Sequence, residues 1–372
     1  MTVSTGFRGL LREQKIIVCC GAGGVGKTTT AAATALAAAR LGRRVLVLTI
    51  DPSKRLAETL GVSRNPPVPV ALDPARLVAM GIAGPGSLDA WLLDPKLVSD
   101  DSVKRIIKDP AEQARFLSNR IYQQVSSMVA GMHEYTAMKA LHQLVTEGKY
   151  DLVVLDTPPS RNALDFLDAP RRLARLLDGK VFQALLPRKG GLIARAASRL
   201  VDRISVTVFG PEFGAELTES IGTFSSLFLQ LGGEVNAMRD LLSQPECAFV
   251  LVCSPAEETL AEVQFFREKS SELGLPFRGF VLNRSRAADD QRVLPGPELL
   301  PPDAGPDAKS GWTKLAVLAR AEYAAAERDR RLLGALIERA GPDAVALAVP
   351  SLPAGADDVA TLVAVADVLA GH

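Results

Sequence analysis

The sequence predicts an α/β fold in which a doubly wound, mostly parallel sheet is flanked by helices. Near-continuous apolar runs of strand length recur along the chain, as in parallel strands that are buried on both faces. Longer segments of helical character separate these runs. The first apolar run leads into a glycine-rich loop and then an alanine-rich segment, and this strand–loop–helix order is typical of such sheets. We expect residues 1–372 to form a single domain around the sheet.

The expected strands are short apolar runs bounded by turn residues. In chain order they are Lys15–Cys20, Arg43–Ile50, Arg76–Ile82 (a short one), Tyr150–Asp156, Cys247–Cys253, Arg278–Asn283 and Ala344–Val349. The expected helices include Lys27–Leu41, about Ala256–Leu273, about Trp312–Ala340 and Asp357–Gly371. Residues 1–14 are expected to form a loose lead-in, and residues 284–312, rich in Pro, Asp and Gly, a long exposed loop.

Two long insertions flank the expected strand at residues 150–156. Residues from about 86 to 148 and from 163 to 244 both have helical character. We expect the two insertions to form a helical subdomain at the ligand edge of the sheet. Insertions in this place commonly carry the specificity for a partner.

The loop Gly21–Thr28 has the sequence GAGGVGKT, which matches the pattern G-x-x-x-x-G-K-T. Its glycines let the backbone curl, so that successive N–H groups and a helix N-terminus converge on phosphate. Lys27 is placed to reach the β- and γ-phosphates, and the Thr28 hydroxyl to bind Mg²⁺. A glycine-rich turn without a ligand is the alternative, but it does not explain the strand and helix on either side. The pattern predicts a P-loop NTPase whose phosphate-binding residues are Gly21, Gly23, Gly24, Val25, Gly26, Lys27, Thr28 and Thr29.

Two acidic residues end expected strands and complete the predicted site. Asp156 closes an apolar run more than 100 residues after the P-loop, as in the Walker B pattern, where the acid lies beside Mg²⁺ or binds it. An ordinary strand end is the alternative. Asp51 follows the run Arg43–Ile50, and an acid at the carboxyl edge of a parallel strand faces the ligand crevice.

The composition argues against nucleic-acid binding, a zinc site and a membrane span. The chain has 43 basic and 42 acidic residues, so no global field favours nucleic acid. Its four cysteines form no C-x-x-C pair, which argues against a zinc site and favours buried free thiols: Cys19, Cys20, Cys247 and Cys253. No apolar run reaches the ~18–20 residues of a membrane span, and residues 1–15 lack the apolar region of a signal peptide. We therefore expect a cytoplasmic protein without a transmembrane segment.

Three segments together resemble the ArsA-type ATPases. They are GAGGVGKTTT at residues 21–30, DPSKRLAETLG at residues 51–61 and DTPPSRNALDFL at residues 156–167. The likeness extends over nearly the whole chain, because SPAEETLAE, VLNR and VPSLP lie where later motifs of that family occur. The family includes the arsenite-pump ATPase and the Get-pathway ATPase that targets tail-anchored membrane proteins. It is grouped with the dimeric MinD and ParA ATPases.

The resemblance implies roles for individual residues. Asp51 would position or activate the attacking water, although an N-cap of the following helix is an alternative role for it. Asp156 and Thr157 would begin a second switch loop that couples loss of the γ-phosphate to movement. Asn283 would read the edge of adenine, or be only a polar strand end, and the Pro350–Leu352 backbone would wall the base.

The motifs and the resemblance together predict one site for ATP and Mg²⁺. The expected cofactors are ATP and Mg²⁺. The expected catalytic residues are Lys27 and Asp51, the expected Mg²⁺ site comprises Thr28, Asp51 and Asp156, and the expected base-binding residues are Asn283, Pro350 and Leu352.

One departure from the family pattern concerns catalysis. The family carries a lysine directly after the first glycine, which reaches the phosphates of the dimer partner, whereas this chain has Ala22. We expect either a paralogue that supplies the lysine, or a substitute such as Lys54 or Arg55. Hydrolysis by the isolated protein is expected to be slow, because a cation of this kind contributes roughly 10³–10⁵-fold to phosphoryl transfer.

Other departures concern metals. The C-x-x-C pair that clamps the eukaryotic targeting factors through zinc is missing, as are the metal-binding cysteines and the tandem duplication of the arsenite pump. The sequence therefore argues against arsenite transport and against a zinc site.

The leading interpretation is a dimeric, Mg²⁺-dependent ATPase whose nucleotide state switches a helical surface for a partner or client protein. The apolar segment Gly222–Leu231 and the stretch Met128–Met138 could line a client groove, or serve in core packing or a dimer contact. The alternative function is an ATP-binding regulatory or scaffold subunit with little hydrolysis of its own, in a heterodimer with a paralogue. Ala22 favours this alternative, whereas Thr28, Asp51 and Asp156 oppose it.

Two further classes fit less well. A ParA-like DNA-partitioning ATPase needs a basic surface, and the arginines between 171 and 188 alternate with Leu and Asp as on a solvated helix face. A small-molecule kinase does not account for the DTPP segment at residues 156–159.

Overall fold

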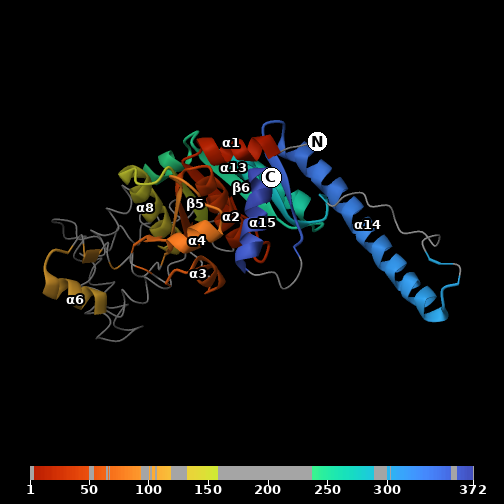
Figure 1. Ribbon diagram of the computed structural model, residues 1–372. Helices are drawn as coiled ribbons and strands as arrows, with labels where there is room; N and C mark the ends of the chain where they lie inside the picture. The colour runs from red at the N-terminus through yellow and green to blue at the C-terminus, as the bar shows by residue number, and fades with distance from the viewer. Residues whose placement is uncertain are drawn as a thin grey trace, which may run out of the picture.

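The structure is a computed structural model, and it describes twelve stretches of the chain. They are residues 4–49, 54–63, 66, 68–93, 100, 103–104, 107–118, 132–157, 237–288, 300–301, 303–352 and 358–371. Within them, eight strands form one sheet in the order β3-β4-β2-β5-β1-β6-β7-β8. All neighbours pair in parallel except β3 and β4, which are antiparallel at the edge. The predicted fold class, a mostly parallel α/β sheet flanked by helices, is confirmed (Figure 1).

The strands are β1 Ile16–Cys20, β2 Arg44–Thr49, β3 Val70–Ala71, β4 Ser87–Leu92, β5 Leu152–Asp156, β6 Cys247–Cys253, β7 Phe277–Ser285 and β8 Val345–Pro350. The helices are α1 Ser4–Glu13, α2 Lys27–Arg40, α3 Lys54–Leu60, α4 Pro74–Ala79, α6 Pro110–Ser118, α8 Met132–Glu147, α13 Thr259–Leu273, α14 Pro306–Ala340 and α15 Asp358–Ala370. The central strands β1, β5 and β6 are buried along their whole length, as their apolar sequences predict.

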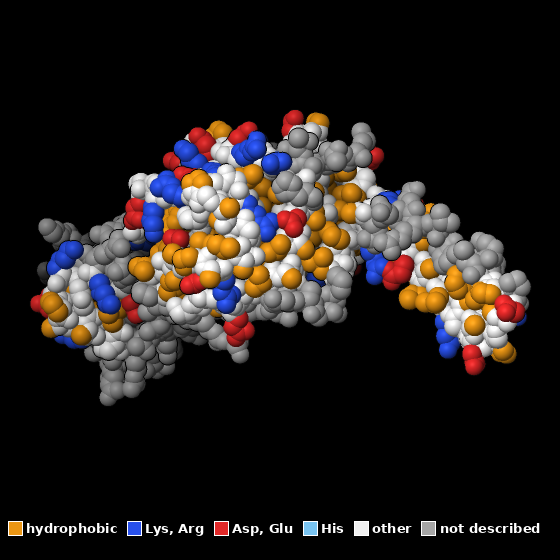
Figure 2. All heavy atoms as spheres, viewed as in Figure 1, with side chains coloured by type: hydrophobic (Ala, Val, Ile, Leu, Met, Phe, Trp, Pro, Cys, Tyr) orange, Lys and Arg blue, Asp and Glu red, His pale blue; other side chains and the backbone are white. Residues whose placement is uncertain are grey.

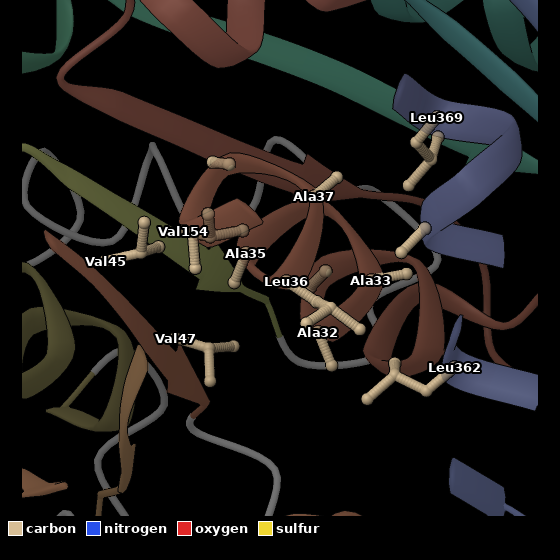
Figure 3. Packing of buried hydrophobic residues seen from close by; sticks show 14 of the residues in the cluster. Ala32, Ala33, Ala35, Leu36, Ala37, Val45, Val47, Val154, Leu362 and Leu369 are labelled. Atoms are coloured by element: carbon tan, nitrogen blue, oxygen red, sulfur yellow. The ribbon is translucent and has the colours of Figure 1, made fainter. Parts of the chain in front are cut away.

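Helices cover both faces of the sheet. One hydrophobic cluster joins the sheet to α8, α13 and the C-terminal half of α14. The other joins the opposite face to α1, α2, α3 and α15. Alanines along α2 lie between β-strand side chains such as Val45 and Val154 and the α15 residues Leu362 and Leu369 (Figure 3). Because alanine has the smallest apolar side chain, α2 can pack closely against both layers.

The two ends of the chain meet on this second face. Phe7 and Leu11 of α1 are 1% and 0% exposed, and α1 contacts α15 and β8. The prediction of a loose lead-in at residues 1–14 is therefore wrong for residues 4–13. The segment is amphipathic, and its apolar side is buried beneath the last helix.

Two further predictions are wrong in the region before β5. Residues 76–79 of the expected strand Arg76–Ile82 instead belong to the helix α4, because Asp73 caps this helix through its side chain and Pro74 occupies its first turn. The helical region expected from residue 86 begins with strand β4, whose buried residues Leu88 and Ala90 pair with β2. Its alternation over only six residues is too short to distinguish from a helical turn by pattern alone.

The helix α14 is longer than expected. It starts at Pro306, within the predicted loop 284–312, and runs for 35 residues to Ala340. Its C-terminal half packs on the body, whereas its N-terminal half extends beyond the sheet (Figure 1). The exposed half carries Leu315 and Leu318, which are 58% and 57% exposed.

Much of the proposed helical subdomain lies outside the described residues. The second insertion is described only from residue 237, and α6 and α8 belong to the first. Gly222–Leu231 and Met128 are likewise outside, so the subdomain and its client groove stay predictions. Among the described residues, no helix is both long and apolar enough to cross a membrane.

Candidate functional site

The candidate site lies at the carboxyl edge of the three central strands. β1 pairs with β5 on one side and with β6 on the other, so that Cys19 lies opposite Asp156 and Cys20 opposite Leu251. The loop Gly21–Gly26 follows β1 directly and leads into α2. The sheet therefore brings the loop, Asp156 and the segment after β6 to one edge, where ligands bind in doubly wound folds.

Three glycines of the loop adopt backbone conformations that require glycine. Gly21, Gly24 and Gly26 have φ of 145°, 81° and 92°. A Cβ on Gly21 would lie 2.1 Å from the Val252 carbonyl oxygen, which shows how closely the loop passes β6. A Cβ on Gly24 would meet no atom within 4 Å, so the loop is open on that side, where a phosphate can approach the backbone. Gly26 caps the N-terminus of α2.

Lys27 begins α2 and curls back over the loop. Its side chain is 6% exposed, and its Nζ donates a hydrogen bond of 2.8 Å to the carbonyl oxygen of Ala22. This places the ammonium against the backbone of the loop. A phosphate bound there would accept from the same ammonium, in keeping with the role predicted for Lys27.

Glu262, in the first turn of α13, is a carboxylate close to this lysine. Burial raises the pKa of its carboxyl, while the backbone N–H of Ala22 and the charge of Lys27 act in the opposite direction. A carboxyl group therefore lies at the edge of the predicted phosphate site. Sequence reasoning did not single out Glu262, because only the pairing of β6 with β1 brings α13 to the loop.

Thr28 and Asp156, two of the three residues of the predicted Mg²⁺ site, are in contact with each other. The Thr28 hydroxyl donates to Asp156 Oδ2 over 2.7 Å, and the Thr49 hydroxyl donates to the same oxygen over 2.9 Å. Asp156 is fully buried. A hydroxyl and a carboxylate are the oxygen donors that Mg²⁺ prefers, so these residues fit the ion. Thr49 was not predicted; a hydroxyl at the carboxyl end of the strand beside Asp156 could have indicated it.

Asn283, which the family resemblance assigned to the edge of adenine, lies against the P-loop. Its Nδ2 donates to the Val25 carbonyl oxygen over 2.8 Å, and the side chain is 7% exposed. It therefore holds the backbone of the P-loop itself. Contact with adenine stays a prediction for this residue.

Pro350 ends β8 and pairs with Ser285 of β7, just after Asn283. Leu352 follows and packs partly against the core. Both residues thus lie at the same edge of the sheet as Asn283. Gly23 and Thr29 are exposed within the loop and in the first turn of α2.

Several predicted residues lie outside what the structure describes. Asp51 is one of them, so the positioning of water and its share in the metal site stay predictions. The side chains of Lys54 and Arg55 are also outside the description. Thr157 is described: its hydroxyl donates to the Cys19 carbonyl oxygen over 2.9 Å, which fixes the start of the predicted second switch against β1.

All four cysteines are buried and free, as predicted. Burial raises the pKa of the Cys20 thiol to about 12 and raises that of Cys19 well above its ordinary value, and Asp156 adds to the rise at Cys19. Such thiols stay protonated and serve as small apolar side chains in the strands.

Comparison with known proteins agrees with the geometry. A profile of the anion-transporting ATPase (ArsA ATPase) family matches residues 14–294, which include the P-loop, Asp156 and Asn283. The chain belongs to the ArsA ATPase family.

Individual relatives are distant in sequence. An uncharacterised protein of Streptomyces coelicolor is 29% identical over 283 residues, which are 76% of this chain and 63% of that protein. The ATPase GET3 of Malassezia globosa is 24% identical over 282 residues, 73% of each chain. A putative arsenical pump-driving ATPase of Aquifex aeolicus is 27% identical over 164 residues, 42% of this chain and 38% of that one. The chain thus spans less than two thirds of the Streptomyces protein.

Proposed function

We propose that the protein is a Mg²⁺-dependent ATPase that works in the cytoplasm as a dimer, and that its nucleotide state switches a helical surface for a protein partner. The observation that carries the ATPase is the hydrogen bond between Thr28 and Asp156 below an open glycine loop. Together with Lys27, these groups form a complete set for the phosphates and the ion of a nucleoside triphosphate. Membership of an ATPase family supports the same conclusion.

The residues act in distinct ways. The loop N–H groups and Lys27 would hold the phosphates, and Thr28 and Asp156 would hold Mg²⁺, which would supply positive charge to the phosphates. Asp51 aligns the attacking water. Thr157, held to β1, starts the segment that moves when the γ-phosphate is lost. The dimer and its partner rest on the family's GET3-like members and are proposals for this chain.

A first experiment measures ATP turnover and light-scattering mass of the purified protein, with Lys27→Ala as the control. Turnover in an ATP-dependent homodimer that Lys27→Ala abolishes would support a self-sufficient ATPase. The absence of both ATP binding and turnover in the wild type would contradict the proposal.

A second candidate function is supported by Ala22. Without the family lysine at this position, the protein binds ATP but depends on a paralogous partner for hydrolysis. Tight ATP binding with negligible turnover would favour this function.

The variant Ala22→Lys separates the two candidates. If the missing cation limits hydrolysis, the variant should raise turnover of the homodimer by about tenfold or more, toward the roughly 10³–10⁵-fold effect of such a cation. The control is Ala324→Lys, an exposed position on α14 far along the chain from the loop. Unchanged turnover in Ala22→Lys would show that another residue already supplies the charge.

A further inference from the structure

The turn after β7 controls the position of Asn283. As described above, the Asn283 amide donates to the Val25 carbonyl oxygen of the P-loop. A Cβ on Gly26 would lie only 2.2 Å from the same Nδ2. The amide therefore fits tightly against Val25 and Gly26, and a shift of Asn283 must displace either the loop or the hydrogen bond.

The backbone beside Asn283 does not hold this position by itself. Arg284 adopts φ of 56°, a left-handed conformation that is unfavourable for a residue with a side chain. The pairing of β7 with β8 shifts in register between Leu282 and Ser285. Asn283 thus sits within an irregular stretch of the strand, which persists only when neighbouring groups hold it.

The carboxylate of Asp329, on α14, holds this irregular stretch in place through hydrogen bonds. Its Oδ2 accepts from the backbone N–H of Arg286 over 2.8 Å and from the Ser285 hydroxyl over 3.4 Å. The Ser285 oxygen in turn accepts from the N–H of Ala287 over 3.0 Å. One carboxylate therefore organises three successive residues that follow Arg284.

Burying the carboxylate of Asp329 costs free energy, and this cost argues against a role in packing alone. Asp329 is 2% exposed among the apolar residues that face the body, between Ala326 and Leu336. Its second oxygen, Oδ1, has no hydrogen-bond partner and only an ion contact of 3.5 Å with Arg328. An apolar residue would pack at this position without that penalty.

The same turn is tied to two other elements. The N–H of Ser351 donates to the Ser285 carbonyl oxygen over 3.3 Å, at the end of β8. The side chain of Arg286 pairs with Glu322, four residues N-terminal to Ala326 on α14. The turn therefore joins the P-loop side of the sheet to α14, near the point where the helix leaves the body (Figure 1).

We propose that Asp329 is a positioning residue of the nucleotide site: by holding the turn Ser285–Ala287 it fixes Asn283, and through Asn283 the P-loop at Val25 and Gly26. This inference rests on the ATP site proposed above. It gives α14 a part in nucleotide binding although the helix contributes no residue to the loop. A partner that moves α14 would change ATP affinity by the same route, and ATP would change affinity for that partner equally.

The test is a double-mutant cycle on the affinity for a fluorescent ATP analogue, using full-length Asp329→Ala, Asn283→Ala and the double variant. Each single change is expected to weaken binding about tenfold, which is within the range for the loss of one hydrogen bond. The double variant is expected to bind no more weakly than the weaker single variant, because both changes release the same segment of the P-loop. Multiplied effects, or an unchanged affinity in Asp329→Ala, would overturn the inference.

Two further variants separate positioning from general stability. Asp329→Asn keeps an oxygen that can accept from Arg286, so it should bind within about threefold of the wild type, and it replaces Asp329→Ala in the cycle if that variant fails to fold. Glu338→Ala, an exposed site on the same helix, should bind within about twofold of the wild type. A wild-type protein that does not bind the analogue would contradict the ATP site itself, whereas binding with an additive cycle would contradict only the role of Asp329.

Discussion

Two alanine-rich helices of this protein have opposite surroundings. In α2, eleven of fourteen residues are buried between the sheet and α15 (Figure 3). In α14, four of thirty-five are buried, and apolar side chains show on its far half (Figure 2). Both sequences favour a helix, since alanine has the highest helix propensity. Helix propensity therefore accounts for the helical conformation of both segments. The elements packed around each helix determine whether its alanines form part of a core.

The largest effect is expected within α14 itself, from a matched pair of leucines. Leu336 is fully buried in the packed half, so Leu336→Ala should lower the free energy of unfolding by about 2–5 kcal/mol, because it leaves a cavity. Leu318, 57% exposed, should tolerate the same change within about 0.5 kcal/mol. Urea unfolding measures both. Equal losses would mean that the N-terminal half of α14 is packed in solution, and the contrast drawn above would fail.

A somewhat smaller effect is expected on α2. Ala35 is fully buried, and Ala35→Leu should destabilise the protein by about 1–3 kcal/mol because the added atoms have no space between the layers. The matched control is Ala324→Leu on the exposed part of α14, which should change stability by about 0.5 kcal/mol or less. A harmless Ala35→Leu would show that α2 can move away from the sheet.

The smallest effect concerns the N-terminal end of α2, which faces the open side of the P-loop. The pKa of Glu262 is raised by burial, so the folded protein keeps this proton to higher pH than the unfolded chain. The free energy of unfolding therefore decreases as the pH rises through the raised pKa. Over the same pH range the Glu262 carboxylate becomes charged and begins to repel phosphate. We expect Glu262→Gln to bind ATP about threefold more tightly than the wild type at pH values above the raised pKa, and equally well once the acid is protonated.

The measurement for Glu262→Gln is ATP affinity as a function of pH, with the exposed Glu268→Gln on the same helix as control. Weaker binding by Glu262→Gln at neutral pH would mean that Glu262 supports Lys27 rather than opposing the phosphate. The thermal midpoint of the variant should likewise rise above that of the wild type only at pH values above the raised pKa.

Some helices and strands could be predicted from the sequence, and others could not. The strands β1, β5 and β6 could be predicted because each is a continuous apolar run, and α2 because it follows the glycine loop. The helix α1 and the strand β4 were not predicted, since an amphipathic segment of ten residues or an alternation over six residues has no unique interpretation without its neighbours. Within the site, Lys27, Thr28 and Asp156 were predictable because a local pattern specifies each one.

Local sequence patterns were enough to predict the glycine loop, the proposed Mg²⁺ ligands Thr28 and Asp156, and the class of sheet, because these depend on residues a few positions apart or on one strand end. Only the tertiary structure decided that Asn283 supports the loop, that Glu262 lies beside Lys27 and that Asp329 holds the turn after β7. Those contacts join residues up to 258 positions apart, and they exist because the sheet order places β6 beside β1 and β7 beside β6. No local pattern encodes that order, since it is set by how all the strands and helices bury their apolar surfaces together.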